Sequence, residues 1–382
     1  MNPYDFVPID TAHPPERHTP VWHNVLAPDK THPGKLYSGY LYLYIRAETP
    51  LFIHDPTSSM QDPDYPGQHL RNMWNEYIIP GTSLKGMLRS VVETLCNGCI
   101  TVFRTPNEYT HNPVPSGFAY CQRNTSLCIA CRLFGMMQAG QQRNAEVFLG
   151  KVNIGDARAY ENNPEFYGPI YTAVLDGPKP RHRAFYLDEQ TRYIAGRKFY
   201  FHHVGEPTTE RRLIQIRDTG KYRNQHIEPL TSGTDFDARI DFTNLEAEEL
   251  AALLLAITLQ PNMRHKIGYG KPMGLGSVWL EVTKLQLVDY ATRYTKFRES
   301  RGITTYENDT LTDLLAGQLV SHDEAVSKAW QRFSSQPALQ HLARIWQWPP
   351  DKTVEYVYPS QQWFKSHSQA RIKDTRNLYP GD

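Results

Sequence analysis

The stretch that decides the fold runs from Tyr77 to Leu95 and reads YIIPGTSLKGMLRSVVETL. A short apolar run ends at its Pro-Gly pair, and the Thr-Ser pair that follows offers side chains that cap helices. Apolar residues then recur at helical spacing, so we predict an amphipathic helix with one buried stripe. Lys85 and Arg89 lie four residues apart on the other face, and the N-terminus of a helix attracts anions. The stretch therefore predicts a helix that offers cations to an anionic ligand.

A second distinctive stretch runs from His265 to Val278 and reads HKIGYGKPMGLGSV. Its glycines permit positive φ and let backbone amides approach a ligand closely. Successive amides in such a loop form a nest for an anion, and a lysine adds a point charge for phosphate. The P-loop motif is excluded, because it needs Ser or Thr after its lysine and Pro272 follows Lys271 here. The dinucleotide-binding fingerprint is excluded too, because Met273 stands where it needs its third glycine. We predict that this loop binds phosphate.

Composition limits the class of protein. The chain has 382 residues, 40% of them hydrophobic, which is enough for one large domain or two modest ones. Its net charge of +1 does not by itself indicate nucleic acid. It contains no long apolar run, and its N-terminus lacks the charged-then-apolar order of a secretory signal. We therefore expect a cytoplasmic protein with no membrane span.

Hydrophobic periodicity outlines one main unit. Residues 1–35 are rich in Pro and His and are expected to form an extended arm. Residues 36–53 alternate apolar residues with tyrosines, which predicts a strand, and residues 54–76 form a long loop of a kind that is usually functional or disordered. A helix is predicted over 245–259, and the glycine-rich loop and a strand close the unit near residue 290. The order of strand, helix, strand, insertion, helix and strand is that of the ferredoxin-like split βαβ plan.

Two other regions stand out. Residues 291–382 form an extension with an amphipathic helical stretch over 325–348, interrupted at Pro337. Residues 179–225 contain eleven Lys or Arg against five Asp or Glu, a net charge of +6, with aromatic residues interleaved. Basic residues mixed with aromatic ones favour a surface for single-stranded RNA.

All five cysteines lie within one short region of the chain. Such clustering in a cytosolic protein favours a metal site over a disulfide scaffold. Cys128 and Cys131 form the Cys-x₂-Cys half-site of tetrahedral zinc, and a second such pair lies upstream. The candidate ligands are Cys96, Cys99, Cys121, Cys128 and Cys131, with His111 as an alternative to one of them.

These segments resemble motifs of the RAMP superfamily of CRISPR-associated proteins. Residues 79–89 resemble its first signature, residues 128–135 the cysteine motif of its type III backbone subunits, and residues 268–276 its C-terminal glycine-rich loop. They occur in the order of the family and, with residues 150–157, extend the resemblance over about residues 36–285. One such domain is present, so the chain resembles a single-domain, Cas7-type backbone subunit of a type III effector complex.

The resemblance implies an α+β fold, a ferredoxin-like (RRM-like) RAMP domain over residues 36–290. It implies a zinc-binding insertion at about 96–135 and a thumb hairpin at about 160–235, followed by the C-terminal helical extension. The cysteine pattern of the family leaves Cys96 spare and matches as zinc ligands Cys99, Cys121, Cys128 and Cys131.

The resemblance also implies the partners, which are CRISPR RNA, a target single-stranded RNA and the other subunits of a type III complex. Phosphate contacts fix register without reading sequence, which suits a subunit that carries a guide RNA. The expected RNA-binding residues are Lys85, Arg89, Arg181, Arg183, Gly268, Gly270, Lys271 and Gly274.

Catalysis is implied through an aspartate in the loop after the first strand. The spacing to Pro80 favours Asp62 or Asp64, and Mg²⁺ or Mn²⁺ would be the divalent ion. Two alternatives stay open. One is an inactive guide-RNA scaffold, and the other is a CRISPR RNA-processing endoribonuclease, for which His265 is the candidate general base.

Overall fold

The architecture was obtained as a computed structural model. It describes residues 1–25, 34–62, 64–100, 113–138, 145–172, 183–203, 217–218, 221–222, 225–295, 302–315, 324–359 and 361–377.

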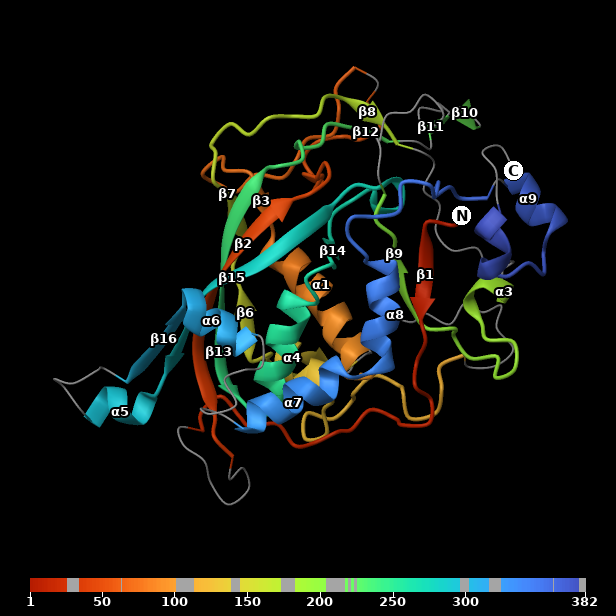
Figure 1. Cartoon of the computed structure of the whole chain (residues 1–382). Coiled ribbons are helices and arrows are strands. Elements are labelled where there is room, and N and C mark those ends of the chain that lie inside the picture. The colour runs from red at the N-terminus through yellow and green to blue at the C-terminus, as the bar shows by residue number, and fades with distance from the viewer. Residues whose placement is uncertain are drawn as a thin grey trace.

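An eight-stranded antiparallel sheet forms the centre of the protein (Figure 1). Its long strands come from alternating sequences that turn apolar side chains to one face and polar ones to the other. The strand order is β14 (His265–Lys266), β15 (Ser277–Val288), β2 (Tyr37–Ala47), β13 (Asp235–Leu245), β7 (Ala157–Ala159) and β3 (Ile78–Ile79), with β16 (Ile303–Glu307) on β15 and β6 (Val152–Ile154) on β13.

Helices cover the apolar face of this sheet (Figure 1). α1 (Gly81–Leu95) and α4 (Ala247–Thr258) pack on it, and α7 (Glu324–Ser334) and α8 (Pro337–Ile345) pack against those two. The buried stripe predicted for α1 meets strand residues such as Leu43 and Ile240 in one continuous core. The core thus fixes α1 and the strand before the glycine-rich loop relative to each other.

The start of α1 explains its Pro-Gly pair. A Cβ atom on Gly81 would lie 2.1 Å from the carbonyl oxygen of Ile154, so only glycine fits where the helix begins against the sheet. The Gly81 amide donates to Asp156 Oδ1 at 2.8 Å. A carboxylate of the chain itself therefore takes a favourable position at the positive end of this helix.

The two chain ends add strands to the fold. β1 (Tyr4–Val7), within the predicted arm, pairs antiparallel with β9 (Arg197–Tyr200). The predicted C-terminal helical stretch is divided before Pro337 into α7 and α8. The extension is not wholly helical, because the β-branched and aromatic sequence of β16 pairs with β15.

Shorter elements occupy the predicted insertions. The helices among them and after them are α2 (Ile129–Phe134), α3 (Arg183–Tyr186), α5 (Tyr290–Thr295), α6 (Asn308–Leu315) and α9 (Gln361–Ser366), with 3-10 turns η3 (Lys271–Met273) and η5 (Ile372–Asn377). The paired strands are β4 (Met136–Met137) with β5 (Val147–Phe148), β8 (Ile170–Tyr171) with β12 (His226–Ile227), and β10 (Arg217–Asp218) with β11 (Lys221–Tyr222). Much of the predicted thumb hairpin lies outside the described residues. Within the part of the chain that is described, no helix is long and apolar enough to cross a membrane.

Candidate anion-binding pocket and metal centre

A pocket of about 530 Å³ lies between α1, the glycine-rich loop, β9 and the loop that follows β2. Three lysines line it, and no Asp or Glu of the described chain does. Positive charge without acidic partners in a concave site favours an anionic ligand. The polar and small residues in the lining are His54, Ser83, Gly86, Ser90, Lys198, Tyr200, Lys266, Gly268, Tyr269 and Lys271.

The glycine-rich loop forms one wall of this pocket. The three glycines singled out from the sequence have positive φ, 83° at Gly268, 72° at Gly270 and 94° at Gly274. A Cβ atom on Gly268 would lie 2.5 Å from the carbonyl oxygen of Phe52, so the loop can pass this close to the neighbouring chain only with glycine there. The amide of Gly268, which lines the pocket, has no hydrogen-bond acceptor among the described residues and is therefore available to an anion. Gly270 and Gly274 are buried and lie outside the lining.

The three lysines reach the pocket from different elements. Lys266, on β14, is only 4% exposed, and its Nζ donates to a carbonyl oxygen of the loop at 3.0 Å. Burial, with the nearby charge of Lys271, lowers the pKa of Lys266 well below its usual value, and burial also lowers the pKa of Lys271. The Nζ atom of Lys198, on β9, lies 3.8 Å from the centre of the Tyr4 ring. A bound phosphate would favour the charged form of each lysine, because an opposite charge nearby stabilises it.

α1 presents small residues to the pocket. Gly86 is exposed, and a Cβ atom built on it meets nothing within 4 Å. The packing of this protein therefore does not require glycine at this position. Glycine is nevertheless present, although inside a helix it costs about 1 kcal/mol relative to alanine. The missing side chain leaves room for a ligand close to the helix backbone. Lys85, next to it, is half-buried and outside the lining, and burial together with the charge of Arg89 lowers its pKa.

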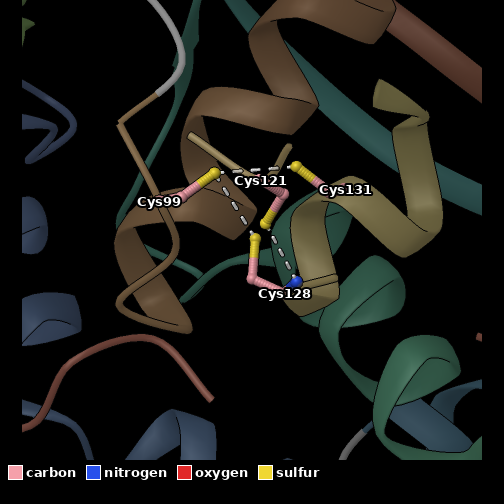
Figure 2. Close-up of side chains that lie close together, drawn as sticks. All are labelled: Cys99, Cys121, Cys128 and Cys131. Carbon is pink, nitrogen blue, oxygen red and sulfur yellow. Dashed lines mark hydrogen bonds between the residues drawn. The ribbon is translucent and has the colours of Figure 1, made fainter. Parts of the chain in front are cut away.

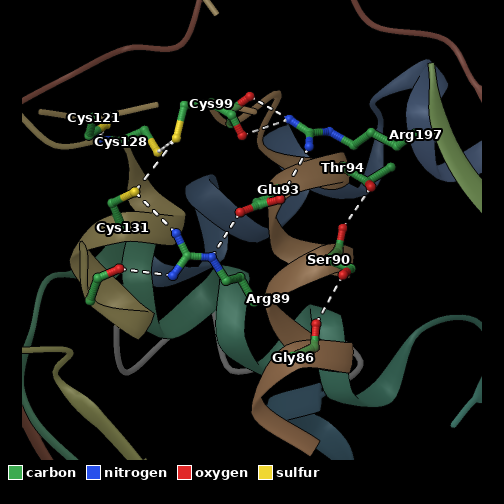
Figure 3. A network of polar contacts seen from close by, with 12 residues as sticks. Gly86, Arg89, Ser90, Glu93, Thr94, Cys99, Cys121, Cys128, Cys131 and Arg197 are labelled. Atoms are coloured by element: carbon green, nitrogen blue, oxygen red, sulfur yellow. Dashed lines mark hydrogen bonds and ion pairs between the residues drawn. The ribbon is translucent and has the colours of Figure 1, made fainter. Parts of the chain in front are cut away.

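Arg89 lies in a polar network beside the cysteines rather than in the pocket (Figure 3). Its Nε donates to Glu93 Oε1 at 2.9 Å, its Nη1 to the carbonyl oxygen of Gly135 at 2.9 Å, and its Nη2 to Cys131 Sγ at 3.3 Å. Burial acts to lower the pKa of Arg89, but the neighbouring Cys131 and Glu93 raise it overall. The donors of Arg89 are therefore used inside the protein, and its predicted contact with RNA stays a prediction.

Four buried cysteines form a compact cluster next to α1 (Figure 2), namely Cys99, Cys121, Cys128 and Cys131. Their sulfur atoms all lie within 4.8 Å of one another, and the Cys99 sulfur lies 3.6 Å from those of Cys128 and Cys131. Zn–S bonds of about 2.3 Å in a tetrahedron place the sulfurs about 3.8 Å apart. The cluster could therefore hold such a metal ion. Cys96 lies outside the cluster, and His111 lies outside the described residues.

The same network joins the cysteine cluster to two walls of the pocket (Figure 3). Arg197, on β9, donates from Nη1 to Glu93 Oε2 at 3.2 Å and from Nη2 to the carbonyl oxygen of Cys99 at 3.2 Å. Glu93 belongs to α1, and Lys198 follows Arg197 along β9. Arg89, Glu93 and Arg197 therefore connect the cysteine cluster to α1 and β9, two elements that line the pocket.

The two candidate cleavage residues lie on the loop after β2 and do not line the pocket. Asp62 Oδ1 accepts the amides of Asp64 and Tyr65 at 2.9 and 3.1 Å, so this oxygen caps a turn. Asp64 is exposed, and its carboxylate has no hydrogen-bond or ion-pair partner within the described chain. Asp64 is therefore the freer of the two to hold a metal ion.

Of three more residues singled out from the sequence, the two that the structure describes, His265 and Arg183, do not line the pocket. His265 is 2% exposed, its Nε2 lies 2.8 Å from the carbonyl oxygen of Ala256, and burial lowers its pKa to about 4. This buried position does not favour the general-base role considered for His265, which stays a prediction. Arg183 is exposed at the start of α3, which lies beside α9 (Figure 1). Arg181 lies outside the described residues.

His54 and Lys198 were not singled out from the sequence, although both line the pocket. His54 lies in a long polar loop, where no hydrophobic periodicity predicts which way a side chain points. Lys198 stands in the short alternating run of β9, and its position depends on the pairing of β9 with β1, far away in the chain. Only the basic character of residues 179–225 signalled a role for Lys198.

Taken together, these features define an α+β protein with a cationic pocket between its first long helix and a glycine-rich loop, backed by a four-cysteine cluster. The family model of the RAMP superfamily matches residues 44–279, and the chain belongs to this superfamily. This membership supports a CRISPR-associated role in RNA binding. A search of curated proteins found no match.

Proposed function

We propose that the protein is a CRISPR RNA-binding backbone subunit of a type III effector complex. The pocket carries this proposal, because three lysines and the Gly268 amide, which has no acceptor among the described residues, line a space that suits the phosphates of an RNA strand. The order β15-β2-β13-β7, with α1 and α4 as the connecting helices, supports the ferredoxin-like plan expected of a RAMP domain.

The cysteine cluster is proposed to hold a structural zinc ion. Four thiolates are a common ligand set of Zn²⁺, and four protein ligands leave no position open for catalysis. The guanidinium of Arg89, which donates to Cys131, would offset part of the negative charge of four thiolates around one divalent ion. The ion would hold α1 and β9 in place behind the RNA.

A test of the pocket uses the exposed glycine of α1. Gly86→Ala is expected to raise the stability of the free protein by about 0.5–1 kcal/mol, because alanine is the better helix former, and to weaken RNA binding about tenfold by filling space that the RNA backbone needs. Thermal unfolding and fluorescence anisotropy with a labelled guide RNA measure the two effects. Thr82→Ala, on α1 but outside the pocket lining, is the matched control. A stabilised Gly86→Ala protein with unchanged RNA affinity would show that RNA does not pass over α1.

Target RNA cleavage is proposed at the loop after β2, with Asp64 as the main carboxylate. A metal-bound carboxylate there would help to position the 2′-hydroxyl of the target for attack on the adjacent phosphate. A second route is processing of CRISPR RNA, and one observation favours it. His54 lines the same pocket as the three lysines, which places a potential general base beside the expected phosphates.

Target cleavage and CRISPR RNA processing differ in whether they need a metal ion, and this difference separates them experimentally. In the assembled complex, the double variant Asp62→Ala/Asp64→Ala is expected to lose target cleavage in Mg²⁺ or Mn²⁺ while it keeps guide RNA. His54→Ala is expected to affect only cleavage that continues in EDTA. Gel assays with end-labelled target and precursor RNAs measure both. If the double variant cuts the target at every position as well as wild type does, the carboxylate proposal is wrong, and if wild type cuts neither RNA, the protein is an inactive scaffold.

A further inference from the structure

The face of the central sheet opposite α1 and α4 carries an aromatic cluster of the half-buried Tyr44 and the exposed Tyr160 and Trp279, called here the Tyr44 cluster. The ring centre of Tyr44 lies 5.9 Å from that of Trp279 with an interplanar angle of 87°, and 6.0 Å from that of Tyr160 with an angle of 58°. Trp279 is 36% exposed and Tyr160 is 57% exposed. The three side chains thus present aromatic surface to solvent from three neighbouring parts of the sheet.

The charges on this face are paired, with two exceptions beside Tyr44. Asp237 on β13 and Glu281 on β15 lie directly opposite Tyr44 in the register of the two strands that flank it. Both are exposed, and neither has an ion-pair partner within the described chain. The ion pairs that do form on this face or at its edge are Arg46–Asp235, Arg158–Glu76, Arg239–Asp241 and Lys284–Glu307.

On the same face, another tyrosine already has a cation over its ring. The guanidinium of Arg239 lies 3.9 Å from the centre of the Tyr40 ring, and Arg239 also pairs with Asp241. A cation over an aromatic ring gains from both the ring and a carboxylate at its edge. In the Tyr44 cluster the guanidinium of Arg264 lies 5.7 Å from the centre of the Trp279 ring, and the Tyr44 hydroxyl donates to Asp235, which pairs with Arg46. Among the described residues no cation lies over the rings of Tyr44 and Tyr160. These two rings, with Asp237 and Glu281 beside Tyr44, therefore offer the acceptor half of an arrangement that is complete at Tyr40.

We propose that the Tyr44 cluster, with Asp237 and Glu281, binds an arginine- or lysine-bearing segment of a partner protein. The two carboxylates lie on either side of β2, so their backbones are about 10 Å apart at two strand spacings. A segment that crosses the strands with two cationic side chains can pair with both. Their negative charge disfavours RNA phosphates, which places this surface outside the proposed RNA path and gives it a different kind of partner. Arginine fits best, because its planar group stacks on aromatic rings while it donates to carboxylates.

The test uses a fluorescein-labelled decapeptide of alternating arginine and glycine as the probe, with anisotropy as the readout. The double variant Asp237→Asn/Glu281→Gln keeps the shape of both side chains and is expected to bind the peptide about tenfold more weakly than wild type. Asp309→Asn/Glu324→Gln removes two exposed carboxylates from α6 and α7 and is expected to bind it as wild type does. Trp279→Leu is also expected to weaken peptide binding. The guide RNA affinity of every variant should equal that of wild type, which shows that each one is folded.

Two results would overturn the proposal. One is equal peptide affinity in the Asp237→Asn/Glu281→Gln variant and its control, which would mean that the peptide responds only to net charge. The other is a loss of RNA affinity in Trp279→Leu with peptide affinity unchanged, which would make this face a base-stacking surface. Either outcome leaves the proposed RNA pocket to be judged on its own variants.

Discussion

Cys131→Ser is expected to release the proposed zinc ion, lower the melting temperature and weaken RNA binding together. The Cys131 sulfur lies 3.6 Å from that of Cys99 and accepts a hydrogen bond from Arg89, so its loss opens the ligand set and the network behind the pocket at once. Structural zinc in small peptides contributes ~10–16 kcal/mol to folding. A loss of about 4 kcal/mol in this larger protein would lower the melting temperature by roughly 5 °C. Zinc content by mass spectrometry, thermal unfolding and RNA titration measure the three effects.

Cys96→Ser is the matched control for this prediction. Cys96 follows the end of α1 but lies outside the cluster, so its variant should keep one metal ion per chain and wild-type RNA affinity. A Cys131→Ser protein that still holds one zinc ion and melts at the wild-type temperature would show that the cluster is not the metal site. If the metal is lost and RNA affinity stays the same, the cluster does not support the pocket through Arg89, Glu93 and Arg197.

Features that depend on local periodicity were predictable from the sequence. The buried stripe of α1 and the alternation along β2 follow directly from which residues are apolar, and the break between α7 and α8 follows from the missing amide of Pro337. The candidate ligand set was predictable for a similar reason, because Cys-x₂-Cys fixes two ligands locally. The resemblance to the cysteine pattern of the family supplied the other two cysteines and left Cys96 out, in agreement with the observed cluster.

Features that depend on distant contacts were not predictable in this way. Lys85 and Arg89 have the same charge sign and helical spacing, yet Arg89 meets Cys131 because α2 packs beside α1. Asp62 was a reasonable carboxylate for chemistry, but one of its oxygens caps its own turn, a local competition that spacing does not reveal. Lys198 reaches the pocket only through the pairing of β9 with β1. In each case a partner far away in sequence, or a local hydrogen bond, decides what the side chain can do.

Replacing Lys266 or Lys271 with methionine is expected to weaken RNA binding about tenfold for each substitution and to reduce the salt dependence of binding by about one counterion each. Methionine keeps most of the length of lysine without its charge. Because Lys266 is almost completely buried and burial lowers its pKa, the charged amine is unfavourable in the free protein. Lys266→Met removes this cost but also removes the donor of the buried Leu275 carbonyl oxygen, so its stability should stay within about 1–2 kcal/mol of wild type while it binds RNA more weakly. RNA titrations at several salt concentrations, with thermal unfolding of the same samples, measure both effects.

The pH dependence of binding distinguishes these lysines from ordinary surface cations. Burial lowers the pKa of Lys266 and Lys271, so both lose their charge at a lower pH than a free lysine, whose pKa is about 10.4. Phosphate binds the charged form, and wild-type affinity should therefore fall as pH rises through this lowered range. Lys271→Arg keeps its charge and should show a smaller fall. Lys328→Met, on the exposed face of α7, should match wild type at every pH and salt concentration. If all variants share one salt slope and one pH profile, RNA is bound outside the pocket, and the charge of these lysines serves another ligand.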